Sequence, residues 1–99
     1  MASVPPENVH LVRRAQRDLD FIQGAERRRI IDDIVRLARR KFPGEIKKIH
    51  GLPGGPLQAD SGRFRILHVW EGKTVIILTV FSRVSQRDAF RSWRKNPSR

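Results

Sequence analysis

Residues 61–90 read SGRFRILHVWEGKTVIILTVFSRVSQRDAF, and this stretch decides the fold. From Phe64 to Trp70, large apolar side chains alternate with a second set led by Arg65, as on the two faces of a strand. The Glu-Gly-Lys sequence that follows is typical of a tight turn. Thr74 to Phe81 is nearly continuously apolar and rich in β-branched residues, which favours a buried central strand. The stretch therefore predicts a β-hairpin.

The residues before this hairpin predict a short strand and two helices. Residues 9–12 are largely apolar and suit a strand. From Arg13 the apolar side chains recur at spacings of four and three, which indicates a short helix that ends at Gly24. A longer helix then carries apolar residues at spacings of three, four and seven up to Phe42, where a Pro-Gly pair stops it. Because the link is so short, the two helices are expected to form an antiparallel hairpin.

The remaining elements are short. An extended stretch around 46–49 precedes a loop at 51–56 that is rich in glycine and proline. After the β-hairpin, a polar stretch leads into a last helix at 87–94. Residues 1–7 and 96–99 are expected to be flexible ends.

These elements describe a single domain of the α+β class that spans residues 1–99. We expect an N-terminal strand and a helix hairpin packed on a twisted antiparallel sheet, with a short C-terminal helix. The helices should cover one face of the sheet and leave the other face open for function.

The charge of the chain is strongly positive. The 21 Lys and Arg residues outnumber the 10 Asp and Glu residues, a formal charge of +11, and the excess runs through both halves. Most of these cations are arginines, whose planar guanidinium suits phosphate groups and stacks on bases. This charge favours a polyanionic partner such as nucleic acid over the plainer interpretation of a merely soluble basic protein.

Several classes of protein are excluded. Without cysteine the chain forms neither disulfides nor thiolate metal sites, and its Asp, Glu and His residues show no ligand-like spacing. We therefore expect no metal and no cofactor. No apolar run approaches the roughly 18 residues of a membrane span, and the first ten residues lack the core of a signal peptide. We expect a cytoplasmic protein with no membrane partner.

Three stretches of the chain, taken in order, carry a family resemblance. The first, VHLVRRAQRDLDFI at 9–22, reads as an opening strand and helix, and the second, IKKIHGLPG at 46–54, as a strand that ends in a glycine turn. The third, at 61–90, has a glycine, an aromatic-Arg strand, a turn, an apolar strand and a basic segment that closes on an aromatic residue. Over residues 9–90 this order resembles the RelE/ParE superfamily of bacterial toxins, although none of the strings is a strict motif.

The resemblance implies one of two activities and a partner. RelE-like toxins enter the ribosomal A site and cut the bound mRNA, whereas ParE-like toxins share the fold and poison DNA gyrase. Both kinds are silenced by an antitoxin whose flexible segment wraps the toxin. The charge of this chain suits a cognate antitoxin with an acidic, partly disordered segment.

Metal-independent RNA cleavage needs a base for the 2′-hydroxyl, cations for the crowded phosphorane and an acid for the leaving 5′-oxygen. Arg65 matches the strand arginine with which RelE-like toxins hold the phosphate; the plainer alternative is a surface arginine that shields apolar neighbours. Arg83 matches a basic position of the family's closing segment, or is ordinary solvated charge. Both are predicted to be catalytic.

Histidine is the usual proton shuttle near neutral pH, and the chain has 3. His50 is predicted to be the catalytic base, because it borders the glycine loop beside Lys47 and Lys48, whose charges favour its neutral form. His68 shares a strand face with large apolar residues and is expected in the core. Nothing points to chemistry at His10.

A second group of residues is predicted to bind nucleic acid. Its members are Lys47, Lys48, Arg63, Arg87 and Phe90. Phe90 can stack on a base, but Phe90 and Trp93 can instead pack against the sheet. The basic runs at 27–29 and 39–41 are either solvated helix charge or contacts to ribosomal RNA.

Two departures from the RelE pattern affect the predicted chemistry. Residues 56–60 carry no cation where RelE-like nucleases often have basic residues. The chain also has no tyrosine, and Phe90 occupies the place of a catalytic one. Because phenylalanine cannot donate a proton, the acid and base of a nuclease would differ here from those of RelE.

The first hypothesis is a toxin that acts as a ribosome-dependent mRNA endoribonuclease, an mRNA interferase. The second, favoured by the missing cations and tyrosine, is a ParE-like inhibitor of DNA gyrase. The third is a nucleic-acid-binding domain without toxicity.

Overall fold

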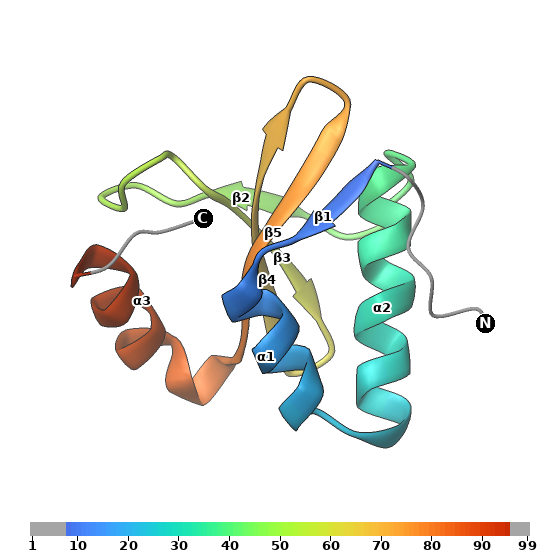
Figure 1. Cartoon of the computed structure of the whole chain (residues 1–99), viewed down its shortest axis with the longest axis horizontal. Coiled ribbons are helices and arrows are strands. Elements are labelled where there is room, and N and C mark those ends of the chain that lie inside the picture. The colour runs from blue at the N-terminus through green and yellow to red at the C-terminus, as the bar shows by residue number, and fades with distance from the viewer. Residues whose placement is uncertain (1–7, 96–99) are drawn as a thin grey trace.

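The computed structural model describes residues 8–95, so the predicted flexible ends at 1–7 and 96–99 lie outside the described residues. Within that range, five strands form one sheet in the order β1-β5-β4-β3-β2 (Figure 1). Their bounds are β1 Val9–Leu11, β2 Ile46–Lys48, β3 Leu57–Ser61, β4 Phe64–Glu71 and β5 Thr74–Ser82. The predicted β-hairpin is the pair β4–β5, near the centre of the sheet.

The sheet is mixed rather than purely antiparallel, which corrects the prediction. The strands β2 to β5 pair antiparallel, but β1 runs parallel to β5, with Val9 opposite Val75. A parallel pair needs a long crossover connection, and the helix hairpin after β1 supplies the start of one. β1 therefore takes the outer position beside β5 instead of pairing with the next strand in the chain.

The periodicity of the sequence does not indicate β3. Its residues, Leu-Gln-Ala-Asp-Ser, have weak strand propensity. A two-residue turn, in which Gly62 has a φ of 61°, folds them back on β4 so that Ser61 lies opposite Phe64. Pairing with a strong neighbouring strand, rather than local propensity, makes this segment a strand.

Three helices accompany the sheet in the described part of the chain: α1 Arg13–Phe21, α2 Gly24–Ala38 and α3 Gln86–Lys95, the last preceded by a 3₁₀ turn at Arg83–Ser85. The α+β class, the helix hairpin and the C-terminal helix are as predicted. Gly24 does not end the first helix, however. It begins α2, with a φ of 65°.

The second helix ends earlier than predicted, at Ala38. Arg40 adopts the left-handed conformation, with a φ of 58°, which glycine usually takes at this position. The Lys41 N–H donates to the Arg36 carbonyl at 2.8 Å and the Arg40 N–H to the Leu37 carbonyl at 3.0 Å. These two bonds satisfy the last helical carbonyls and close the helix before Phe42.

The helix hairpin contributes apolar side chains from both helices to one buried core. Ala15 and Leu19 come from α1, and Ile30, Ile34 and Leu37 come from α2. They belong to one buried cluster with the apolar side chains of β4 and β5. The amphipathic spacing in the sequence therefore identifies the core face of each helix.

The opposite face of the sheet is not open along its whole length, which corrects the expectation of a free face. α3 lies on the other side of the strands from α2 (Figure 1). Its Phe90 packs edge-on against Phe81 of β5, with 5.6 Å between the ring centroids. Its Trp93 is buried, and the indole N–H donates to the Pro53 carbonyl at 3.1 Å. α3 and the loop before β3 thus form a second cover.

Asp18 anchors α1 to the sheet beyond the end of β1. Because β1 ends at Leu11, opposite Ile77, no strand of residues 8–95 lies beside this edge of β5 past that point. There the Asp18 carboxylate accepts hydrogen bonds from the Thr79 hydroxyl at 2.6 Å and the Val80 N–H at 2.9 Å. Burial raises the pKa of Asp18, although both bonds favour its charged form. One carboxylate thus gives a partner to a strand edge that the sheet leaves unpaired.

His68 is a core residue, as predicted. It is fully buried in β4, with Nδ1 at 3.2 Å from the Ile66 carbonyl oxygen. Its Nε2 is buried and has no hydrogen-bond partner among residues 8–95. Burial lowers the pKa of His68, because a charged imidazolium in this apolar setting would lose its hydration.

Replacing His68 with leucine should remove part of the pH dependence of folding stability. Because the folded-state pKa of His68 is lowered, the unfolded chain takes up a proton more readily once the pH falls below about 6.5. The stability that neutral His68 permits is therefore full above that pH and is lost as the pH falls toward the lowered pKa. Midpoints of urea unfolding between neutral and mildly acidic pH should fall in the parent and stay flatter in His68→Leu. His10→Leu, at an exposed histidine, should behave like the parent; a parallel fall in all three proteins would contradict the assignment.

Candidate nucleic-acid interface

Arg65 is held in the middle of three neighbouring strands. It lies in β4, with Asp60 of β3 as its Cα partner on one side and Phe81 of β5 on the other. Directly opposed residues project from the same face of a sheet, so the three side chains lie together. The Arg65 side chain is 18% exposed, and its Nε lies 3.4 Å from the Asp60 Oδ1. It is therefore oriented by the sheet while remaining within reach of solvent.

The Asp60 carboxylate joins two neighbours through one oxygen. Its Oδ1 accepts a hydrogen bond from the Gln58 Nε2–H at 3.4 Å and also makes the ionic contact with Arg65. Neither contact uses Oδ2, and the Asp60 side chain is 50% exposed. Residues 56–60 thus bring an amide and a carboxylate, rather than cations, to the face that Arg65 shares.

The guanidinium of Arg65 keeps donors for a further partner. Its Nε is buried and makes no hydrogen bond, since the contact with Asp60 is ionic rather than a well-aligned hydrogen bond. Within residues 8–95, Asp60 is its only ionic partner. A phosphate that approaches the partly exposed end of this side chain would meet a preoriented fork of N–H groups.

Arg83 lies at the same end of the sheet as Arg65. Its backbone N–H donates to the Arg63 carbonyl at 3.0 Å, which extends the β4–β5 ladder beyond the pair of Phe64 and Ser82. Arg83 is exposed and follows Phe81, the Cα partner of Arg65, by two residues. The backbone of both arginines that the sequence singles out therefore lies near the same end of the β4–β5 ladder.

Arg63 is engaged elsewhere. Its guanidinium donates to both carboxylate oxygens of Glu26, at 2.6 Å from Nε and 3.0 Å from Nη2, and lies over the ring of Phe64. This pairing lowers the pKa of Glu26 and raises the pKa of Arg63. The predicted contact of Arg63 with nucleic acid would require it to exchange this partner for a phosphate.

The C-terminal helix places its predicted residues beside this surface. Phe90 contacts Phe81 and is half-buried, so its ring supports the sheet face next to Arg65. Arg87 is exposed one turn earlier on α3. The packing interpretation of Trp93 is correct, since that side chain is buried.

The predicted residues of β2 are divided between the two faces of the sheet. Lys47 lies opposite Gln58 and shares its face, whereas Lys48 lies opposite Leu57 and projects to the other side. When the pairing of β2 with β3 and of β3 with β4 is followed across the sheet, His50 lies five residues beyond the position on its own chain segment that is level with Arg65. Five residues correspond to about 17 Å along the strands. The sheet therefore does not bring His50 to Arg65.

Residues 8–95 contain neither a metal-binding cluster nor a membrane-spanning helix. No group of three or more His, Asp or Glu side chains there is arranged to hold a metal ion. No helix in that range combines the length and the apolar character needed to cross a membrane.

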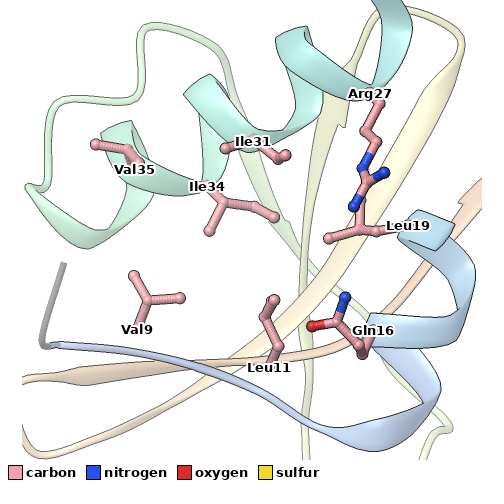
Figure 2. Close-up of a pocket in the computed structure, with 8 residues that line it drawn as sticks. All are labelled: Val9, Leu11, Gln16, Leu19, Arg27, Ile31, Ile34 and Val35. Atoms are coloured by element: carbon pink, nitrogen blue, oxygen red, sulfur yellow. The ribbon is translucent and has the colours of Figure 1, made fainter. Parts of the chain in front are cut away.

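An apolar cavity of about 260 Å³ lies away from this surface, between β1 and the helix hairpin (Figure 2). Val9 and Leu11 of β1 line it on one side and Ile31, Ile34 and Val35 of α2 on the other. Gln16 and Arg27 also line it, so the cavity is mainly but not wholly apolar.

The chain is similar to solved structures of toxin–antitoxin complexes. No protein-family model and no curated protein matches the chain. The RelB–RelE antitoxin–toxin complex from Methanococcus jannaschii matches with a TM-score of 0.67 and 26% sequence identity, over 82% of this chain and 98% of that chain. The toxin–antitoxin complex RelBE2 from Mycobacterium tuberculosis matches with a TM-score of 0.56 and 28% identity, over 81% and 100%.

Replacing Arg83 with glutamine should weaken the binding of single-stranded RNA and lower its dependence on salt. One lost phosphate contact reduces the slope of log K against log salt by about 0.7 for a single strand. Titrating a labelled oligoribonucleotide at several salt concentrations measures this slope. Lys73→Gln removes an exposed positive charge from the turn between β4 and β5 and is the matched control. Equal slopes for the two variants would show that net charge alone, and not this end of the sheet, binds the RNA.

Proposed function

We propose, from the premise that the chain is a RelE-like toxin in fold, that it is the toxin of a toxin–antitoxin pair and a metal-independent endoribonuclease that cleaves mRNA on the ribosome. The observation that carries the proposal is the pair of Arg65 and Asp60 on one face of the sheet, 3.4 Å apart, with Arg83 at the same end. This set offers a cation for the phosphate and a carboxylate beside it.

The chemistry assigns a role to each of the three side chains. Arg65 and Arg83 bind the scissile phosphate and stabilise the charge that grows on its oxygens. Asp60 takes the proton from the 2′-hydroxyl, whose oxygen bonds to phosphorus while the bond to the 5′-oxygen breaks. The leaving oxygen takes a proton from water, and the products are a 2′,3′-cyclic phosphate and a 5′-hydroxyl.

Asp60 replaces His50 as the base in this proposal. It is half exposed and touches Arg65, so a phosphate bound by the arginine places the neighbouring 2′-hydroxyl within its reach. His50 lies in the exposed loop after β2, about 17 Å further along the register. Its role stays a prediction from the sequence that this arrangement does not favour.

Incubating the purified protein with programmed ribosomes and mapping the ends of the mRNA tests the proposal. Asp60→Asn should lower the cleavage rate by roughly 100-fold to 10,000-fold, the usual contribution of a general base. Arg65→Ala should lower it by at least about 100-fold, as expected for a group that stabilises developing charge. Asp32→Asn, at an exposed carboxylate of α2, is the control and should cleave like the parent. Uncut mRNA with the parent protein would refute the nuclease proposal.

A ParE-like inhibition of DNA gyrase is the second candidate. It is favoured by the absence of cations at 56–60 and of tyrosine from the chain, because a toxin that does no RNA chemistry needs neither. Adding the protein to a gyrase supercoiling reaction distinguishes the two functions. Undisturbed supercoiling would remove this candidate.

The proposed partners follow from the same premise. An antitoxin with an acidic segment would complement the net charge of +11, and mRNA and the ribosome would be the targets in the cytoplasm. We also treat residues 1–99 as one toxin domain. The two solved complexes, in which such a chain is found together with an antitoxin, support the antitoxin as the first partner to seek.

A further inference from the structure

The end of α2 and the β4–β5 hairpin border a small cavity that the proposed chemistry does not use. Its volume is about 170 Å³, and it is lined by Leu37, Arg40, Phe42, Ile46 and Trp70. Trp70 and Phe42 are only partly buried, so part of each ring remains exposed. The cavity therefore offers aromatic rings and a guanidinium to a ligand, and not aliphatic surface alone.

This cavity is separate from the surface at Arg65. Trp70 lies five residues beyond Arg65 in β4, which is about 17 Å along the strand. Because side chains alternate along a strand, Trp70 projects to the face that carries the helix hairpin, opposite to the face of Arg65. Its contact with Leu37 of α2 in the wall of the cavity agrees with this side. A ligand here would not compete with a phosphate at Arg65.

The Arg40 guanidinium is stacked on the Trp70 ring. Its Cζ lies 3.9 Å from the ring centroid, the distance of direct contact between a planar cation and a π face. Arg40 is exposed and forms no ion pair with another side chain of residues 8–95. The guanidinium can therefore keep its place at the cavity and still meet an anion from solvent.

The backbone of Arg40 adopts a conformation that does not suit arginine. Its φ of 58° lies in the left-handed region, where a Cβ crowds the following carbonyl and where glycine is usual. Closing α2 requires this conformation but not the side chain. Residues held in such conformations cluster at ligand sites. At Arg40 the strained residue is the one that carries a cation to the exposed ring of Trp70.

Gly44 allows the Phe42 ring to lie where it does. A Cβ added at Gly44 would lie 2.9 Å from the Phe42 Cε2, well inside the usual separation of two carbon atoms. The ring thus occupies space that any other residue at position 44 would fill. Both aromatic walls of the cavity are therefore positioned by the backbone around them, Trp70 by a central strand and Phe42 by a glycine.

The surroundings of the cavity are mostly positive. The segment 39–50 has one acidic residue, Glu45, and the end of β4 adds Glu71. Lys48 shares the face of the cavity, because it lies two residues after Ile46 in β2. The exposed cations on this face and at the end of α2 are Arg39, Arg40, Lys41 and Lys48. Aromatic rings among cations are the arrangement with which proteins bind single-stranded nucleic acid, since bases stack while phosphates meet the charges.

We propose that this cavity binds an unpaired base of single-stranded RNA, with the base against the exposed part of the Trp70 ring and the Arg40 guanidinium and the adjacent phosphates beside Lys41 and Lys48. The choice of RNA among ligands with a planar ring rests on the proposed function. The site is a second RNA contact on the opposite face of the sheet from the scissile phosphate. It holds RNA and takes no part in cleavage.

The probe is an octamer of 2′-O-methyladenosine, which cannot be cleaved because its 2′-oxygen carries no proton. A base stacked on Trp70 quenches indole fluorescence, so titration of the protein with this octamer should lower its tryptophan emission. Trp93, the other of the 2 tryptophans, is 2% exposed and should not respond. Trp70→Phe keeps a ring but removes the reporter, and should bind a labelled octamer without this loss of emission. An abasic strand of the same length should leave the emission unchanged.

Three variants separate stacking from general charge, with octamer binding measured by anisotropy. Trp70→Leu should weaken binding roughly 5-fold to 100-fold, the range for one stack of a base on an aromatic ring. Arg40→Gly should weaken it by about tenfold and should unfold at no lower urea concentration than the parent, because glycine takes a φ of 58° without strain. Arg91→Gln removes an exposed charge from α3, on the other side of the strands (Figure 1). It is the control and should bind within about twofold of the parent at physiological salt.

Each of the following results would overturn the proposal. Trp70→Leu and Arg40→Gly could bind the octamer as the parent does, which would make the contact between Arg40 and Trp70 purely structural. The abasic strand or adenosine monophosphate could lower the emission as much as the octamer, which would assign the change to phosphate or to a free nucleotide. A blue shift on concentrating the protein alone would assign the cavity to a second copy. If Arg40→Gly does not fold, Trp70→Leu decides alone.

The test is independent of the proposed nuclease activity, because it uses neither ribosomes nor cleavable RNA. Arg65→Ala should show the same loss of Trp70 emission as the parent once the octamer is saturating. An active nuclease whose octamer binding does not depend on Trp70 would refute only this inference. An inactive protein whose emission falls through Trp70 would refute only the proposed function.

Discussion

The burial of β5 on both of its faces is the constraint on which the rest of the structure depends. Every residue from Val75 to Phe81 is buried, so neither face of this strand can be left to solvent. One face requires the helix hairpin, whose α1 is held against the strand edge by the Asp18 carboxylate. The other requires α3, whose Phe90 packs on Phe81. Because β5 needs a helical layer on each face, only the parts of the sheet outside these two layers are available for function. These parts are the end of the sheet at Arg65 and Arg83 and the outer edge at β2.

This constraint explains why the central arginine is both well placed and partly shielded. Arg65 is next to Phe81 on one side and Asp60 on the other, so its position is set by two ladders and a packed aromatic pair rather than by a mobile loop. An arginine held in this way loses little conformational freedom when a phosphate binds. The carboxylate of Asp60 holds the guanidinium through Nε, and the terminal nitrogens remain for an anion. The contact between Arg65 and Asp60 can therefore persist whether or not substrate is bound, as a preorganised site requires.

The sequence predicts those parts of the fold whose signal is local. Apolar spacing identifies the two helices and the β4–β5 hairpin, and the composition of the end of the chain identifies α3. It misses β3, whose five residues become a strand only by pairing with β4, and it misses the parallel pairing of β1, which depends on a non-local choice of neighbour. The sequence predicts too great a length for α2, because an arginine rather than a glycine takes the left-handed position that ends the helix. Arg65 and Arg83 are predicted from the family resemblance, which places one arginine within a strand and the other directly after the last strand. Asp60 is overlooked because it lies beside Arg65 only through the pairing of β3 with β4. The short turn at Gly62 would have allowed this pairing to be worked out from the sequence, by counting back from Arg65.

The two uncovered surfaces differ in how their cations are arranged. Arg65 lies within β4, and Arg83 directly follows β5 at the same end of the sheet. The edge of β2 carries cations on both faces, because Lys47 and Lys48 are consecutive residues of a strand. Of these two, only Lys47 shares the face of Arg65, so the positive charge of this edge is divided between the two faces of the sheet.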